Sequence, residues 1–352
     1  MSNQFRQPGD AGIRFLLVGA CLVVIITGLR LAAPIILPFL TAVFLAVVII
    51  PLMNWLVHSR VPKPAAVLLT ILTTISIVGV LVAVVVTSLN QLTVVAPTYQ
   101  ERFQQLVMLM TATAEHIGLP VDQWVETIVP SGLFDLMGGV IGNTLRAVGS
   151  FLSNSFLVLL TVVFILFEAA GFGTKLKIAF GADRDPFGPM MRMAKQVQNY
   201  LVVKTAVSAL TGVTVGLFVA VMGLDFPLLW GVLAFIFNFI PTLGSILAAI
   251  PAVLLALLQF GPGRAAMITL GYFAVNLLLG SVLEPTLTGR RLGLSTVVVF
   301  VSLVFWGWVW GPVGMLFSVP LTMAVKIALE NTDEFRWVAV MLDANPSVPR
   351  KV

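Results

Sequence analysis

The chain carries a succession of apolar stretches, most of them about as long as a bilayer is thick, separated by short polar segments. A hydrocarbon core about 30 Å thick requires about 20 helical residues at 1.5 Å each, so every stretch of that length is a candidate membrane span. Hydrophobic residues make up 59% of the chain and charged residues only 10%, whereas a soluble domain has roughly 25% charged residues. The sequence therefore predicts an all-α protein that crosses a membrane many times.

We expect about eight transmembrane helices and one apolar segment of unusual length. The spans are expected at 12–33, 35–57, 65–89, 150–170, 200–222, 265–283, 294–311 and 313–330. The unusual segment, 227–259, would be roughly 48 Å long as a straight helix, which is too long for one span and too short for two with a turn. Asn238, Pro241 and Gly244 lie near its middle, so we expect a broken helix or a re-entrant hairpin there.

Basic residues in the polar segments predict the orientation, because short cytoplasmic loops carry an excess of Lys and Arg. Segments 58–64 and 171–199 are basic, whereas acidic residues outnumber basic ones in 90–149. Both termini are therefore expected in the cytoplasm. We expect four regions, namely N-terminal membrane helices in 1–89, an extracytoplasmic amphipathic helical segment at 90–149, a C-terminal membrane region at 150–330 that includes the hairpin, and a cytoplasmic tail at 331–352.

Several classes of function lack the motifs that they need. There is no phosphate loop of the G-x-x-x-x-G-K-[ST] type, so we do not expect the chain to use ATP by itself. Cys21 is the single cysteine, and His58 and His116 are far apart, so we expect no disulfide framework, metal cluster or cofactor. The net charge of +5 is not arranged as a basic stripe with stacking aromatics, which argues against nucleic acid. An enzyme is not expected.

Two glutamates close to the ends of predicted spans are candidate ion or substrate groups. Ionisable residues at membrane depth usually face a cavity or a partner and mark a transport path. Glu168 ends the span 150–170, and Glu284 follows the span 265–283 immediately before Pro285. The alternative is that each is an interfacial carboxylate at the headgroup level, paired with Lys175 or Arg290.

The break in 227–259 is a second candidate. Unwound backbone at membrane depth is tolerated where protein or a water-filled cavity satisfies the freed carbonyls, and transporters build midplane sites from broken helices. Asn238, Pro241 and Gly244 would form such a site, and Asn276 and Ser281 on the next span could face the same point. The alternative is a proline kink that Asn238 joins to a neighbouring helix, with Asn276 and Ser281 bonded between helices.

Six short strings, taken in order, resemble the autoinducer-2 exporter family of bacterial membrane proteins. They are ILPFL at 36–40, IPL at 50–52, NFIPTLG at 238–244, EP at 284–285 with Gly289, Leu292 and Leu294, WGWVWGPVG at 306–314, and VPL at 319–321. The resemblance covers nearly the whole chain and is weakest in 90–149 and in the tail. It implies a polytopic transporter of about eight helices that forms a homo-oligomer, and a cargo of autoinducer-2 or of sodium and protons.

Together these observations predict a secondary exporter of a small polar molecule or ion in the bacterial inner membrane, in contact with membrane lipid. The site is expected near the 238–244 break and the 284–290 turn, which contains Glu284, Pro285, Gly289 and Arg290. Glu284 is the residue expected to link transport to a proton or cation gradient. A sodium/proton antiporter, a passive channel and a scaffolding membrane protein whose segment 90–149 binds a partner remain alternatives.

Overall fold

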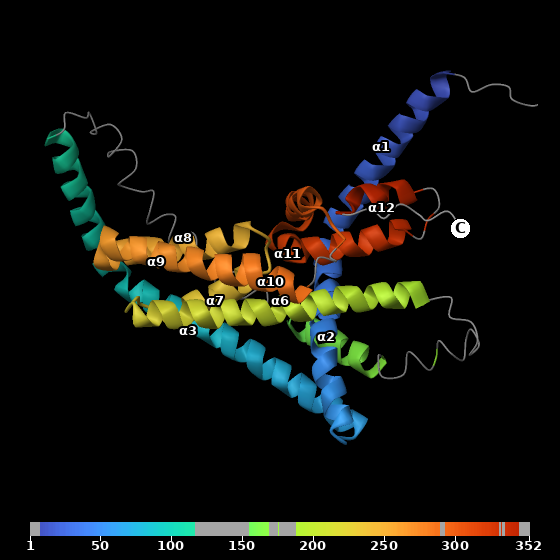
Figure 1. Ribbon diagram of the computed structural model, residues 1–352, viewed down its shortest axis with the longest axis horizontal. Coiled ribbons are helices and arrows are strands. Elements are labelled where there is room, and N and C mark those ends of the chain that lie inside the picture. Colours follow the sequence, from blue (N-terminus) through green and yellow to red (C-terminus); the bar gives the residue numbers. More distant parts are fainter. Residues whose placement is uncertain are drawn as a thin grey trace, which may run out of the picture.

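A computed structural model describes residues 8–116, 155–168, 175, 188–288, 293–330, 332 and 335–344, and these residues contain helices and no strand. The helices are α1 (Pro8–Leu31), α2 (Ala33–His58), α3 (Lys63–His116), α6 (Gly188–Val221), α7 (Pro227–Phe237), α8 (Leu243–Phe260), α9 (Pro262–Val275), η1 (Asn276–Leu283), α10 (Glu284–Thr288), α11 (Thr296–Glu330) and α12 (Arg336–Leu342). A further helix covers Ser155–Glu168. Figure 1 shows α6 to α9 as a bundle of roughly parallel rods, with α1 apart from them at the upper right, above α12.

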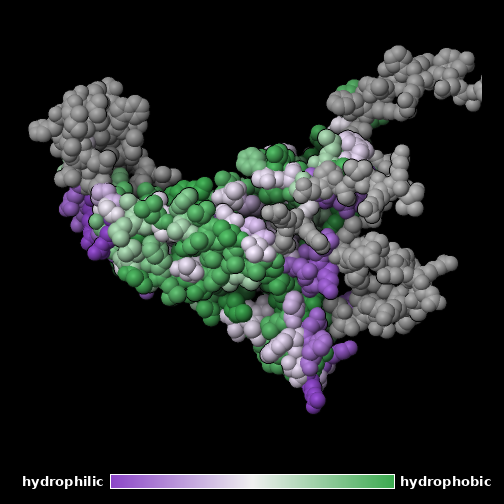
Figure 2. Space-filling view, viewed as in Figure 1, coloured by the Kyte–Doolittle hydropathy of each residue, from purple (hydrophilic) through white to green (hydrophobic). Residues whose placement is uncertain are grey.

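Among the described residues, six helices are long and apolar enough to cross a membrane. They are Ala33–His58, Lys63–Gln105, Ala194–Val221, Leu243–Phe260, Pro262–Leu287 and Thr296–Glu330. Shorter apolar helices cover Gly19–Leu31, Ser155–Glu168 and Pro227–Phe237. Figure 2 shows a hydrophobic surface over α8 and α9, with hydrophilic residues at the far end of α3 and at the turn between α2 and α3. The prediction of a polytopic helical membrane protein is confirmed.

The third predicted span does not end where the sequence suggested. We expected a span at 65–89 followed by a separate outer segment, but α3 runs unbroken from Lys63 to His116 with Pro97 inside it. One continuous helix therefore carries the chain out of the apolar region and into the amphipathic stretch. The rest of the predicted outer segment, 117–149, lies outside the described residues.

The segment 227–259 folds as a helical hairpin, here called the first hairpin, made of α7, a turn at 238–242, and α8. At its open end the Asp225 amide donates to the side-chain oxygen of Gln259 at 3.1 Å, and the Gln259 amide donates to Asp225 Oδ1 at 3.1 Å. These bonds join residues that flank the two arms, so the chain reverses at the turn. The predicted break at the middle of this segment is confirmed as a turn.

Small residues let α7 pack closely against α6. A Cβ at Gly212 would lie 2.7 Å from the carbonyl oxygen of Gly231, and one at Gly231 would lie 2.8 Å from that of Gly212. Side chains at these positions would push the backbones apart, since real Cβ atoms do not approach so closely. The first hairpin is thereby held flush against α6.

A second hairpin is formed within α11. Gly311 has φ 64° and ψ −148°, a combination that essentially only glycine adopts. Trp306 Nε1 donates to Thr322 Oγ1 at 3.1 Å although 16 positions separate the two residues. A straight helix would place them roughly 24 Å apart, so α11 is two arms that fold back at Gly311. This agrees with the two separate apolar helices expected at 294–311 and 313–330.

Candidate transport site

A cavity of about 380 Å³ lies where the tip of the first hairpin meets α6, η1 and the open end of the second hairpin. We call it the site cavity. It is lined by Tyr200, Lys204, Asn238, Ile240, Pro241, Thr242, Ser245, Asn276, Gly280, Ser281, Glu284, Pro285, Gly293, Leu294, Val299, Val319 and Ala344. Six of these, Asn238, Pro241, Asn276, Ser281, Glu284 and Pro285, are candidates named from the sequence. The structure therefore brings the predicted break and the predicted Glu284 turn together.

An ion pair between α6 and α10 dominates the charge of this cavity. Lys204 Nζ lies 2.7 Å from Glu284 Oε1 and 2.8 Å from Oε2. The two side chains are 6% and 18% exposed. Taking a charge out of water costs several kcal/mol, so each group depends on the other for its ionised form. Glu284 is thus the partner of Lys204 and not a lone carboxylate.

Lys204 was not identified from the sequence. It lies near the beginning of the predicted span 200–222, where a basic residue resembles the flank of a cytoplasmic loop, and the basic segment 171–199 precedes it directly. Its position along the helix could have identified it. Because α6 begins at Gly188, Lys204 lies well inside the helix and not at its end. A lysine so placed is a candidate for a functional group by default.

The tip of the first hairpin is held in an unusual backbone conformation. Thr242 has a positive φ of 56°, which costs a non-glycine residue energy and occurs often at functional sites. A Cβ at Gly244 would lie 1.8 Å from the carbonyl oxygen of Phe237, so only glycine fits there. Asn238, which is buried, donates from Nδ2 to Ser208 Oγ on α6 at 2.9 Å. The tip is therefore pinned to α6 one helical turn from Lys204.

The opposite wall of the site cavity is a π-helix. η1 covers Asn276–Leu283 and contributes Asn276, Gly280 and Ser281 to the lining. Such segments are rare and frequently mark functional sites. Here the π-helix lies directly between α9 and Glu284, so its geometry determines the direction in which the Glu284 side chain points.

The segment that follows α12 also reaches the site cavity, since Ala344 lines it. Lys326 on α11 holds this segment in place. Its Nζ donates to the Gly293 carbonyl oxygen and to Asp343 Oδ2, each at 2.6 Å, and lies 3.4 Å from Glu330 Oε1. Lys326 is a second buried lysine that the sequence reasoning missed.

The remaining candidates lie elsewhere or outside the description. Gly244 supports the hairpin tip without lining the cavity. Glu168 pairs with Lys175 at 2.8 Å, and the two side chains are 55% and 67% exposed, which matches the alternative of an interfacial ion pair. Gly289 and Arg290 lie outside the described residues.

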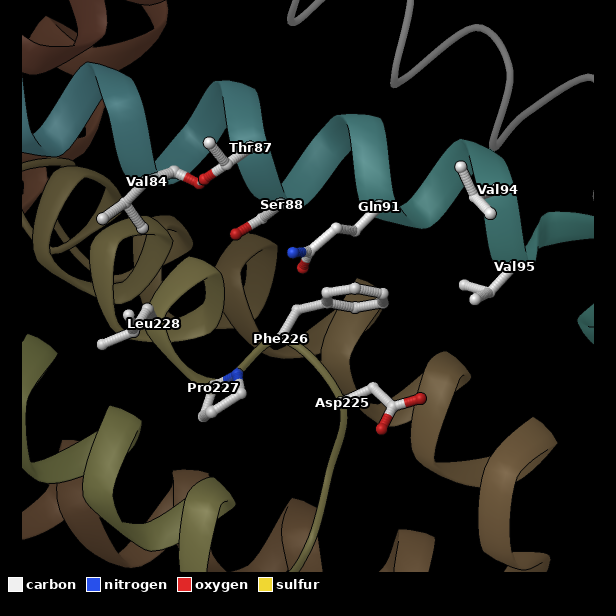
Figure 3. A pocket seen from close by; sticks show the side chains of 10 residues that line it. All are labelled: Val84, Thr87, Ser88, Gln91, Val94, Val95, Asp225, Phe226, Pro227 and Leu228. Atoms are coloured by element: carbon white, nitrogen blue, oxygen red, sulfur yellow. The ribbon is translucent and has the colours of Figure 1, made fainter.

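A larger cavity, of about 600 Å³, lies at the open end of the first hairpin between α3 and α7. Figure 3 shows Gln91 on α3 pointing toward the ring of Phe226, while Asp225 lies at the edge of the cavity. Asp225 accepts a hydrogen bond from the Tyr99 hydroxyl, and Arg102 donates to the Gln259 carbonyl oxygen at 3.2 Å. The side chains that line this cavity include no buried ion pair, so the smaller site cavity is our candidate for the transport site.

The described residues contain no group of three or more His, Cys, Asp or Glu side chains that could hold a metal ion. They form a polar pocket at the tip of a broken helix, with the buried positive charge of Lys204 and the partly buried negative charge of Glu284. Pockets of this kind at the end of discontinuous helices are how many secondary transporters bind their cargo. The fold and the cavity together are those of a polytopic helical membrane transport protein.

Comparison with known proteins gives the family. Residues 20–334 match the AI-2E family transporter family, and the chain belongs to that family. It is 38% identical over 333 residues to the AI-2 transport protein TqsA of Escherichia coli K12, covering 94% of this chain and 96% of that protein. It is 35% identical over 333 residues to a putative transport protein of Haemophilus influenzae. It is also 33% identical over 338 residues, 96% of each chain, to the putative transport protein YhhT of E. coli. The resemblance drawn from the sequence strings is confirmed.

Proposed function

We propose that this protein is a secondary exporter of a small polar molecule in the bacterial inner membrane, and that the solute passes through the site cavity. The observation that carries the proposal is the Lys204–Glu284 pair at the tip of the first hairpin. A volume of about 380 Å³ lies within the roughly 300–1,000 Å³ of pockets that bind small molecules. The relative named an AI-2 transport protein supports a cargo resembling autoinducer-2.

The ion pair supplies a means of linking the solute to a gradient. A proton or a cation that reaches Glu284 competes with Lys204 for the carboxylate, since the two distances of 2.7 and 2.8 Å leave the lysine as its neighbour on both oxygens. Neutralising Glu284 leaves the Lys204 charge buried and unpaired, which is strongly unfavourable. Occupancy by an ion and the conformation of the cavity are therefore linked.

We place the first hairpin inside the bilayer as a re-entrant element. α7 has 11 residues and is roughly 16 Å long, about half the thickness of the hydrocarbon core. With the open end of the hairpin at the outer surface, its tip and the site cavity lie at membrane depth. This orientation leaves both termini in the cytoplasm, as the basic segments 58–64 and 171–199 predict.

The test is flux in proteoliposomes, with autoinducer-2 and then sodium offered under an imposed proton gradient. Saturable movement of autoinducer-2 that requires the gradient is the expected result, and Glu284→Gln should abolish the gradient dependence. Glu168→Gln is the matched control, because Glu168 belongs to an exposed pair. Movement of sodium alone would favour the antiporter, to which a buried carboxylate is equally suited. Flux that ignores the gradient would favour a channel, and no flux of either would favour a scaffold.

A further inference from the structure

Behind the tip of the first hairpin lies a second, very small cavity of about 10 Å³. Its polar lining comes from five side chains, one from each of five elements, which are Thr211 on α6, Asn238 at the end of α7, Ser245 on α8, Tyr272 on α9 and Asn276 on η1. It shares Asn238, Ser245 and Asn276 with the site cavity, so the two cavities adjoin at these side chains. We call it the oxygen pocket.

Tyr272 indicates that this pocket binds something. Its side chain is buried, with 6% of the residue exposed. Among the described residues, its hydroxyl is the one fully buried side-chain nitrogen or oxygen that has no hydrogen-bond partner. Leaving a buried polar group without a hydrogen bond costs about 1–3 kcal/mol. Such a group therefore calls for an explanation, and a bound ion or ligand is one.

The hydroxyl hydrogens of Thr211 and Ser245 and one amide N–H of Asn238 already donate to protein atoms. Thr211 donates to the Val207 carbonyl oxygen at 2.9 Å, Ser245 donates to the Thr242 carbonyl oxygen at 3.3 Å, and the Asn238 amide donates to Ser208. Each of these groups therefore has acceptor lone pairs left, and no spare donor on the two hydroxyls. The acceptor oxygens that remain on Thr211, Ser245 and Asn238 can ligate a cation.

Three further features indicate the class of cation. The pocket lies at the carboxyl end of α7, where the helix dipole places partial negative charge. No carboxylate lines it, whereas calcium and magnesium sites in proteins rely on carboxylates. A volume of about 10 Å³ admits one particle of about the size of a water molecule. A small monovalent cation satisfies all of these conditions.

We propose that the oxygen pocket is a binding site for one small monovalent cation of the size of Na⁺, ligated by the Tyr272 hydroxyl and by oxygens of Thr211, Asn238 and Ser245. A cation there fixes the tip of the first hairpin against α6 and α9, immediately behind the wall of the site cavity. Only the role of the cation in coupling rests on the proposed function. The binding of the cation itself requires no transported solute.

The experiment compares the apparent melting temperature of the detergent-solubilised full chain in NaCl, KCl and choline chloride at equal ionic strength. The wild type is expected to melt roughly 2 °C or more higher in NaCl, because a ligand that binds only the folded state stabilises it. Tyr272→Phe should remove this difference. In choline chloride Tyr272→Phe should be as stable as the wild type or more so, because it deletes a buried hydroxyl that then has no partner.

Thr269→Val on the same helix is the matched control. Its hydroxyl donates to the Ala265 carbonyl oxygen of its own helix at 2.9 Å and does not line the pocket, so it should keep the response to NaCl. Equal stability of the wild type in all three salts would overturn the proposal. If Tyr272→Phe were less stable than the wild type in every salt, a bound water would be the occupant instead. Absence of flux with a retained NaCl response would refute the proposed function and leave the cation site standing.

Discussion

Lys204 places its ammonium nitrogen within 2.8 Å of both carboxylate oxygens of Glu284, 80 positions further along the chain. Removing one partner strands a buried charge, and this costs on the order of 3–5 kcal/mol. We therefore expect Lys204→Met and Glu284→Gln each to lower the stability of the purified protein strongly. The loss of stability in the double variant should be smaller than the sum of the losses in the two single variants, by about 1–3 kcal/mol. Thermal melts of all four proteins measure the cycle, and strictly additive losses would contradict a direct pair.

Gly244→Ala should displace the tip of the first hairpin. The new Cβ would lie 1.8 Å from the Phe237 carbonyl oxygen, which is backbone and cannot rotate away. Overpacking of this kind costs typically about 1–3 kcal/mol, and here it also moves Asn238 and Thr242 out of the cavity wall. Transport should be lost at unchanged membrane insertion. Gly79→Ala, where nothing lies within 4 Å of the added Cβ, should transport normally. Normal flux in Gly244→Ala would show that the tip is not part of the path.

The re-entrant path of the first hairpin predicts which side of the membrane each end of the following helix faces. Single cysteines at positions 262 and 288, placed in a Cys21→Ser background, lie at opposite ends of the continuous helix formed by α9, η1 and α10. In intact cells a membrane-impermeant thiol reagent should label position 262, and position 288 only after the membrane is opened. The reverse pattern would mean that the first hairpin opens toward the cytoplasm, and it would overturn the proposed orientation.

Tyr99→Phe should loosen the open end of the first hairpin. The hydroxyl donates to the carboxylate of Asp225 from a different helix, and hydrogen bonds to charged groups contribute about 1.5–3 kcal/mol. The expected result is a lower melting temperature and faster proteolysis near 222–226. Thr93→Val, which removes a hydroxyl bonded only within α3, should behave as the wild type. Identical behaviour of the two variants would mean that the bond does not hold the hairpin.

The sequence predicted the helical class, most of the spans and the position of the first break, because these follow from the length of apolar runs and from Pro241 and Gly244. It also placed Asn238 and Glu284 in one site. This succeeded because polar groups at membrane depth must find partners, and few elements were available to supply them.

What the sequence did not predict are contacts between distant helices. Lys204 looked like the end of a basic loop, since its burial depends on where α6 begins and on the arrival of Glu284 from α10. The continuity of α3 was missed because a change from apolar to amphipathic composition does not by itself interrupt a helix. Tyr272 gave no signal, because an aromatic residue in an apolar run is usually only packing.

Lys326 joins Asp343 and the Gly293 carbonyl oxygen, and Ala344 forms part of the cavity wall. The segment that contains α12 therefore helps to form the wall of the site cavity and is not a mere appendage of α11. Truncation before Asp343, or a fusion partner that displaces α12, should therefore alter the site cavity itself. Reporter fusions and affinity tags are safer on the amino-terminal side, because no residue of α1 lines the site cavity.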